Sequence, residues 1–192
     1  MTTNRKCPPQ RPGKSVQEVG TPKSLITAIE HRFGKLRWDL AASHDNAKCL
    51  HYFTLEKEVP RGCSAFNHIT CDALKVDWPV EGLCYLNPPF SDLAPWARKA
   101  YEESQKGAKV FLLTPLTCSR WHQKWIYGKA YILQLTPRLV FENHTASFPK
   151  DLQLAFFNSG IRGTEIWDWT ITLKKHEQRI QGLDGRPSTP AQ

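Results

Sequence analysis

Two stretches of the chain carry apolar residues at helical spacing. Leu25, Ile29 and Phe33 recur at every fourth position, and the apolar residues between positions 93 and 101 follow an i, i+3, i+4, i+7, i+8 pattern. Residues that commonly begin or end helices flank both stretches: Thr21 with Pro22, Ser91 or Asp92, Gly34 and Gly107. The pattern therefore predicts two amphipathic helices, each of which buries one face.

Shorter apolar runs between and after these helices are typical of strands. They are 36–40 (LRWDL), 50–54 (LHYFT), 82–86 (GLCYL), 109–113 (KVFLL), 130–135 (AYILQL), 138–142 (RLVFE), 152–157 (LQLAFF) and 166–173 (IWDWTITL). The segment 41–49 is predicted as a loop that leads into a helix, 56–70 as a loop, and 119–128 as a short helix or a series of turns. Helices thus alternate with strands early in the chain, and strands dominate later.

This order of elements predicts an α/β fold with a mostly parallel sheet and antiparallel strands near the C-terminus. In open sheets of this kind, ligands bind beyond the carboxyl ends of the strands. Asp39 and Asn87 each stand at the carboxyl end of a predicted strand. We therefore expect their side chains to lie on the same edge of the sheet and to belong to one site.

The length of 192 residues accommodates one folded unit, which we place at residues 20–175. The flanking segments 1–19 and 176–192 are polar and are predicted to be disordered tails. No apolar run approaches the roughly 18 residues of a membrane span, and the N-terminus has no apolar signal region, so we expect a cytoplasmic protein. The six cysteines include no C-x-x-C pair, which favours reduced thiols, and neither they nor the seven histidines have the spacing of a metal site.

The net charge of +8 is unevenly distributed along the chain. Between Ser104 and Phe141 there are six lysines and arginines and no acidic residue, and the first 14 residues carry four more. Such one-sign segments favour a polyanionic partner such as nucleic acid; a solvated basic face and a solubilising tail are the simpler alternatives. We interpret the nearby Trp121 and Trp125 as core residues. The candidate DNA-binding cations are Arg120, Lys124, Lys129 and Arg138.

The most informative stretch is Asn87-Pro88-Pro89-Phe90, directly after a predicted strand. Neither proline can donate a hydrogen bond to a sheet ladder, so the strand ends here in a rigid turn. The side-chain carbonyl of Asn87 and the backbone carbonyl of Pro88 are two acceptors, and Phe90 presents a flat apolar face. This combination matches a planar group that carries an NH₂. Acceptors on both amine hydrogens would favour pyramidalisation and free the nitrogen lone pair for attack on an activated methyl carbon.

The motif resembles the [DNS]-P-P-[YFW] motif of amino-methyltransferases that use S-adenosylmethionine. The wider pattern covers about residues 20–158 and adds Thr-Pro at 21–22, DLAAS at 39–43, DALKVDW at 72–78 and RLVFE at 138–142. In this combination the chain is similar to the phage and prophage DNA adenine N6-methyltransferases of the short Dam-like type. The resemblance implies a Rossmann-like S-adenosylmethionine-dependent methyltransferase fold, S-adenosylmethionine as the cofactor, and as substrate an adenine flipped out of DNA.

Carried over position by position, the resemblance assigns Asn87, Pro88, Pro89 and Phe90 to catalysis. Asn87 and Pro88 would accept hydrogen bonds from the adenine amine, and Phe90 would stack on the extruded base. The resemblance assigns a second group of residues to the cofactor: Thr21, Pro22, Asp39, Ala41, Ala42, Ser43 and Asp72.

Several of these assignments have alternatives in the sequence itself. No G-x-G follows the first strand, so DLAAS would replace the usual glycine-rich cofactor loop. Whether Asp39, Asp45 or Asp72 binds the cofactor ribose therefore stays open. Thr21 with Pro22 also fits a helix start, Asp39 a cap, and Asp72 a turn.

Two other functions share parts of the pattern. A methyltransferase that acts on an RNA base or a protein glutamine amide would present the same NH₂ group to the motif, and the one-sign basic stretch favours nucleic acid over protein. A catalytically inactive relative would bind DNA in a salt-dependent way without the cofactor. The intact Asn-Pro-Pro-Phe sequence argues against this last function.

Overall fold

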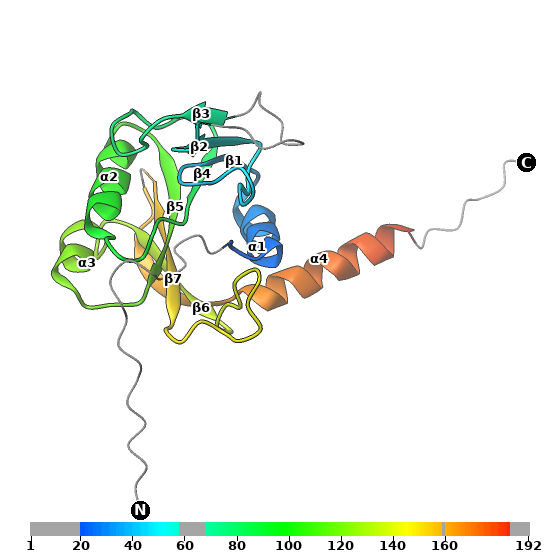
Figure 1. Cartoon of the computed structure of the whole chain (residues 1–192). Helices are drawn as coiled ribbons and strands as arrows, with labels where there is room; N and C mark the ends of the chain where they lie inside the picture. The colour runs from blue at the N-terminus through cyan, green and yellow to red at the C-terminus, as the bar shows by residue number, and fades with distance from the viewer. Residues whose placement is uncertain (1–19, 58–67, 159, 185–192) are drawn as a thin grey trace, which may run out of the picture.

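The computed structural model describes residues 20–57, 68–158 and 160–184. The predicted tail 1–19 with its four basic residues, the last eight residues of the predicted tail 176–192, and the cysteines Cys7 and Cys63 lie outside these ranges. The described chain forms four helices and eight strands (Figure 1). The helices are α1 (Lys23–Phe33), α2 (Ala94–Gln105), α3 (Arg120–Trp125) and α4 (Trp169–Asp184). The strands are β1 (Leu36–Asp39), β2 (His51–Thr54), β3 (His68–Thr70), β4 (Leu83–Leu86), β5 (Lys109–Pro115), β6 (Tyr131–Thr136), β7 (Leu152–Phe157) and β8 (Gly163–Asp168).

The eight described strands form one sheet in the order β3-β2-β1-β4-β5-β7-β6-β8. The two ladders of β7, with β5 and with β6, are antiparallel, and the other five ladders are parallel. This topology confirms the predicted α/β fold with a mostly parallel sheet and antiparallel pairing near the C-terminus. The carboxyl ends of every described strand except β7 meet at one edge of the sheet, which we call the carboxyl edge.

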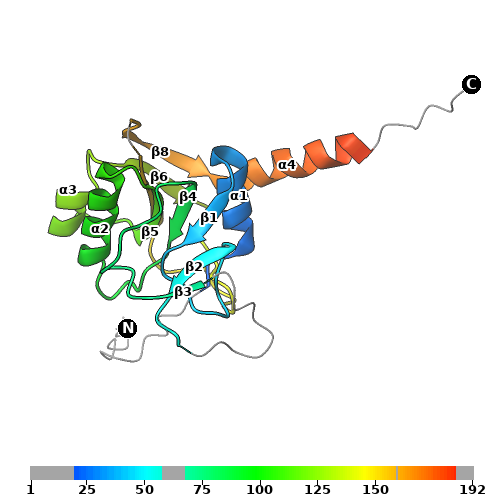
Figure 2. The same cartoon turned by 90° about the horizontal axis from the view of Figure 1, so that it is seen from above.

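Helices cover both faces of the sheet (Figure 2). On one face, α1 buries Leu25 and Ile29 in a core that contains the stacked rings of Phe111 and Phe156, with centroids 4.1 Å apart. On the other face, α2 contributes Ala97 and Ala100 to a second core, beside α3. The first turns of α4 lie beside α1, and the rest of α4 extends away from the sheet in both views (Figures 1 and 2). No helix in the described ranges has the length and apolar character needed to cross a membrane.

The helix starts differ from the predicted ones. The N-cap residues are Pro22 for α1 and Leu93 for α2, and neither makes a side-chain capping hydrogen bond. The predicted caps Thr21 and Ser91 or Asp92 therefore precede the N-cap positions by one or two residues. The predicted end of α1 is correct, because Gly34 adopts a φ of 102°, which side chains other than hydrogen disfavour.

One predicted strand near the C-terminus was wrong, and another was correct only for its first three residues. Residues 138–142 form a loop, in which the carbonyl of Leu139 accepts a 2.7 Å hydrogen bond from the N–H of Phe148 rather than a ladder bond. The run 166–173 divides at Asp168, whose Oδ1 accepts hydrogen bonds from the N–H groups of Thr170 (3.0 Å) and Ile171 (3.3 Å). This side chain stops β8 and starts α4, because it satisfies backbone donors of the first helical turn.

Three further segments differ from their predictions. The segment 41–49 leads into β2 instead of a helix, because Asn46 Oδ1 accepts a 2.8 Å hydrogen bond from the N–H of Ser43 and closes a turn. Strand β3 lies in the stretch predicted as a loop, where pairing with β2 overrides a weak local pattern. Helix α4 continues to Asp184, so the segment predicted as a tail from residue 176 is helical up to that point.

Candidate active site

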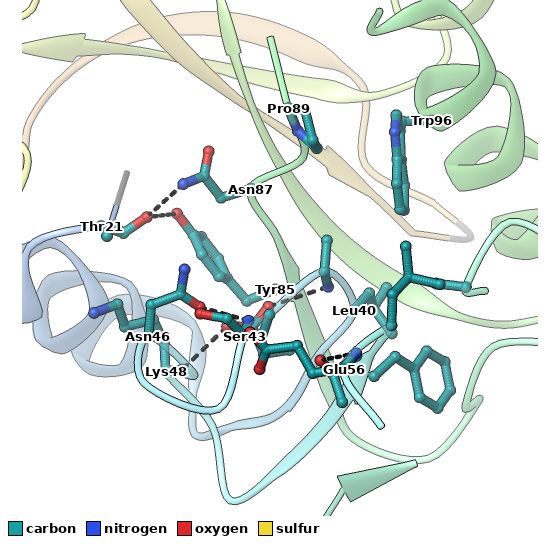
Figure 3. A pocket seen from close by; sticks show the side chains of 18 of the residues that line it. Thr21, Leu40, Ser43, Asn46, Lys48, Glu56, Tyr85, Asn87, Pro89 and Trp96 are labelled. Carbon is teal, nitrogen blue, oxygen red and sulfur yellow. Dashed lines mark hydrogen bonds between the residues drawn. The ribbon is translucent and has the colours of Figure 1, made fainter. Parts of the chain in front are cut away.

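A pocket of about 230 Å³ opens at the carboxyl edge, where β1, β2 and β4 end (Figure 3). Of the predicted site residues, those that line it are Thr21, Asp39, Ala41, Ala42, Ser43, Asp72, Asn87 and Pro89. Pro22, Pro88 and Phe90 are not among the lining residues. The expectation that Asp39 and Asn87 share one edge of the sheet agrees with this geometry, because β1 and β4 are adjacent parallel strands.

The amide of Asn87 has a defined orientation in the pocket. Its Nδ2 donates a hydrogen bond to Thr21 Oγ1 at 3.2 Å, and Thr21 Oγ1 is 2.7 Å from the hydroxyl of Tyr85. Figure 3 shows the amide nitrogen directed at Thr21 and the amide oxygen on the other side of the group. Burial raises the pKa of Tyr85 well above its ordinary value, so its hydroxyl stays protonated.

Phe90 lies beside the pocket and packs on neighbouring rings. It is half-buried and makes edge contacts with Phe141 and Phe148, with centroid distances of 6.3 and 5.7 Å. Both partners belong to the loop after β6, which includes the segment 138–142. The loop that was predicted as a strand thus supports the aromatic residue of the motif.

Asp39 organises the loop that follows β1. Its Oδ1 accepts a hydrogen bond from the N–H of Ala41 (3.3 Å), and its Oδ2 accepts one from the N–H of Lys48 (3.0 Å). The side chain is buried, which raises its pKa to about 6, while these two hydrogen bonds act in the opposite direction. A carboxylate with two oxygens has lone pairs left for a ligand in the pocket.

The loop backbone is also held by the neighbouring strands. The N–H of Leu40 donates to the carbonyl of Tyr85 (2.9 Å), and the N–H of Ala42 donates to the carbonyl of Phe53 (3.0 Å). The small side chains of Ala41 and Ala42 face the pocket, so a ligand can approach the backbone closely. The sequence DLAAS therefore forms a pocket surface of mostly small residues that backbone hydrogen bonds hold in place, and it contains no glycine.

Two acidic residues lie at the β2 and β3 side of the pocket. Glu56 Oε2 accepts a 2.7 Å hydrogen bond from the N–H of His44, and its side chain is 44% exposed. Asp72 accepts a 3.1 Å hydrogen bond from the N–H of Leu74 and pairs with Lys75, and these contacts lower its pKa. Asp72 is thus both a turn residue and a pocket residue, and Glu56 was missed by the sequence analysis.

An ion pair joins the loop after β1 to the loop after β6. Lys48 Nζ lies 2.5 Å from Glu142 Oε2, and the N–H of Glu142 donates to the carbonyl of Gly20 at 2.8 Å. A Cβ at Gly20 would meet the end of the Glu142 side chain, which would have to shift to make room. The pocket wall beside Thr21 is therefore held by contacts between residues more than 90 positions apart.

The family model for DNA N-6-adenine-methyltransferase (Dam) matches residues 13–152 of the chain. The chain belongs to this Dam family. It is 26% identical over 147 residues to the DNA N-6-adenine-methyltransferase of Escherichia phage T1, an alignment that covers 76% of this chain and 56% of that protein. It is 30% identical over 95 residues to the putative methyltransferase YfdM of Escherichia coli (strain K12), covering 45% of this chain and 85% of that protein.

The chain thus spans little more than half the length of the phage T1 relative. A looser structural similarity, with a TM-score of 0.42 and 12% identity, relates it to a modification subunit of a putative type I restriction enzyme from Vibrio vulnificus YJ016, over 92% of this chain and 55% of that one. The Dam family assignment does not depend on this similarity. Helix α4 lies beyond the segment that the Dam family model matches.

The predicted DNA-binding cations of this Dam family chain are not clustered. Arg120 begins α3 and follows the carboxyl end of β5, and Arg138 follows the carboxyl end of β6, so both lie near the carboxyl edge. Arg138 forms a 2.7 Å ion pair with Asp151. Lys129 precedes β6 and therefore lies at the opposite edge, with its ammonium 5.7 Å from the centre of the Tyr101 ring. Lys124 is exposed on α3, 4.8 Å from the centre of the Trp125 ring.

Sequence reasoning also missed an aromatic pocket residue. Trp96 was interpreted as part of the apolar face of its helix, and it does contact the core, but it also lines the pocket together with Pro89 (Figure 3). Glu56 had a usable signal, since it follows the end of a predicted strand as Asp39 and Asn87 do. Trp96 had none, because helical spacing does not show which core residue reaches the edge of a sheet.

Cys49, Cys71, Cys84 and Cys118 are free, and no group of three or more potential metal ligands occurs among the residues that the structure describes. Burial raises the pKa of Cys84 to about 12, so this thiol stays protonated.

Proposed function

We propose that this chain is a DNA adenine N6-methyltransferase that uses S-adenosylmethionine and acts on an adenine flipped out of the helix. The observation that carries the proposal is one continuous pocket that contains both the loop of Asp39 and the motif residues Asn87 and Pro89. Membership of the Dam family and the match to the phage T1 relative support the same function.

The pocket residues suit S-adenosylmethionine. Asp39 offers a carboxylate to a ligand ammonium, the small side chains of Ala41 and Ala42 allow close approach, and Glu56 and Asp72 offer acceptors to ribose hydroxyls or adenine. Trp96 and Pro89 add apolar surface for a flat ring. When bound, this cofactor supplies an electrophilic methyl carbon on a sulfonium, with a neutral thioether as its leaving group.

The motif residues would prepare the adenine amine for reaction. The amine lone pair is delocalised into the ring, so the amine is a weak nucleophile. Hydrogen bonds from its two N–H groups to Asn87 Oδ1 and the Pro88 carbonyl would draw the nitrogen toward a pyramidal geometry, in which the lone pair is available. Phe90 would hold the ring of the base, with its orientation set by Phe141 and Phe148.

A base stacked inside duplex DNA cannot reach a pocket at the edge of a sheet, so the proposal includes base flipping. The phosphate contacts that position the duplex would come from cations near the carboxyl edge, of which Arg120 is exposed and Arg138 pairs with Asp151.

The test is an assay with labelled S-adenosylmethionine and three acceptors: unmethylated DNA of diverse sequence, RNA and protein. The expected product is N6-methyladenine in DNA, identified by nucleoside analysis, with Asn87→Ala as the inactive control. Label in RNA or protein alone would move the function to those acceptors. An absence of N6-methyladenine from all DNA substrates would refute the proposal.

A further inference from the structure

Thr21 is a buried hydroxyl whose partners are distant in sequence. It directly precedes Pro22 at the start of α1, is 1% exposed, and makes no capping hydrogen bond to the helix. Its Oγ1 instead lies 2.7 Å from the Tyr85 hydroxyl and accepts a 3.2 Å hydrogen bond from Asn87 Nδ2. The local structure of the helix start does not explain why this buried hydroxyl forms hydrogen bonds with Tyr85 and with the motif residue Asn87.

Tyr85 and Asn87 reach Thr21 from the same side of the sheet. They are two residues apart at the end of β4, and alternate residues of a strand share a face. Tyr85 is fully buried, and its ring belongs to the core that α1 also packs against. The core thus fixes the tyrosine hydroxyl, and that hydroxyl in turn restricts where the Thr21 hydroxyl can lie.

The orientation of the Asn87 amide matters for the proposed reaction. An amide group is planar, so a hydrogen bond that holds Nδ2 toward Thr21 turns Oδ1 to the other side, as Figure 3 shows. The reverse orientation would present N–H donors to the N–H donors of the substrate amine. Such an arrangement repels the amine and cannot polarise it.

We propose that Thr21 is a positioning residue that sets the orientation of the Asn87 amide for methyl transfer, and that Tyr85 holds Thr21 in place. This inference rests on the proposed function. It differs from the role that the family resemblance implies for Thr21, which is contact with the cofactor. The two roles make opposite predictions, because a cofactor contact controls cofactor affinity and an orienting contact controls the rate at saturation.

The experiment compares Thr21→Val, which keeps the shape without the hydroxyl, with Thr21→Ser, which keeps the hydroxyl. We expect Thr21→Val to lower kcat roughly tenfold at saturating cofactor and DNA, the effect of one lost orienting hydrogen bond. Its affinity for S-adenosylhomocysteine, measured by calorimetry, is expected to stay within about threefold of wild type. This change is smaller than the roughly tenfold change expected in kcat. Thr21→Ser should recover most of the lost rate, and Tyr85→Phe should lower kcat by roughly threefold.

Each alternative result has a definite meaning. An unchanged kcat in Thr21→Val, a loss confined to cofactor affinity, or an equal loss in Thr21→Ser would each overturn the positioning role. If thermal melting shows that Thr21→Val is unfolded, Thr21→Ala against Thr21→Ser gives the same comparison. A wild-type protein that makes no N6-methyladenine would refute the proposed function itself, whereas an active wild type with an equally active Thr21→Val would refute only this inference.

Discussion

Asp39 and Asn87 end neighbouring parallel strands, yet the protein holds them in opposite ways. Asp39 accepts hydrogen bonds from backbone groups two and nine residues further along the chain, so it shapes its own loop. Asn87 is held through its amide by Thr21, which is 66 residues away in the sequence. Asp39 therefore fixes the conformation of the loop that forms the pocket surface. The side chain of Asn87 is itself oriented by a contact that only the tertiary structure provides.

The largest effect on methylation is expected from removing the amide of Asn87. Asn87→Ala deletes the amide acceptor, and methylation should fall by about 10²–10³-fold, the scale for one lost donor or acceptor at a developing charge. The affinity for S-adenosylhomocysteine should change only a few-fold, because the loop of Asp39 is intact. Initial rates and calorimetry on the same preparation measure both quantities, and a near-wild-type rate would contradict the role of the amide.

Asp39, the residue that holds the loop, is expected to make the stability of the protein depend on pH. The pKa of Asp39 rises from 3.8 to about 6 on folding because the carboxyl is buried. Between these values the folded protein keeps a proton that the unfolded chain has released. The free energy of unfolding of the wild type, relative to Asp39→Asn, should therefore fall by up to about 3 kcal/mol as the pH rises from about 4 to 6.

Urea denaturation of both proteins across this pH range measures the difference. Asp72→Asn is the matched control, because hydrogen bonding lowers the pKa of Asp72 and its contribution changes only below pH 3.8. Its difference from wild type should therefore be flat between pH 4 and 6. A flat difference for Asp39→Asn as well would show that Asp39 is not buried as a neutral acid.

Phe90 tests whether the aromatic residue of the motif serves the base or only the core. Phe90→Ala should weaken capture of the base by about 1–3 kcal/mol, visible in the KM for DNA. Because Phe90 also contacts Phe141 and Phe148, the variant should lose stability too. Phe148→Ala removes one of these packing contacts but keeps the Phe90 ring itself, so it should lower the Tm with a smaller effect on KM. Equal KM effects in the two variants would argue against stacking.

The smallest effect is expected for the basic residues. Arg120 lies near the carboxyl edge and Lys129 at the opposite edge. Arg120→Ala should lower the slope of log affinity for DNA against log salt by about 1, and Lys129→Ala should leave it unchanged. Fluorescence anisotropy at several salt concentrations measures the slope, and a loss with Lys129→Ala would mean that DNA contacts the far edge as well.

Local sequence signals were enough for much of the site. The prolines of the motif had to end β4, and the end of a strand in a parallel sheet had to lie at the carboxyl edge, so Asn87 and Asp39 were placed together correctly. The same reasoning failed for 138–142 and for residues 169–173 of the run 166–173. Apolar residues in a loop that packs under Phe90, or in the first turns of α4, give the same short pattern as a strand.

By itself, the sequence determined the α/β class of the fold, the edge at which the motif lies and the chemistry available there, because each follows from spacing and from the covalent properties of proline and asparagine. Only the tertiary structure decided that Thr21 contacts Tyr85 and Asn87, that Glu142 packs against Gly20, and that Lys129 lies at the opposite edge from the pocket. These contacts join residues far apart in the chain, and side-chain geometry across a packed core decides them rather than any local preference.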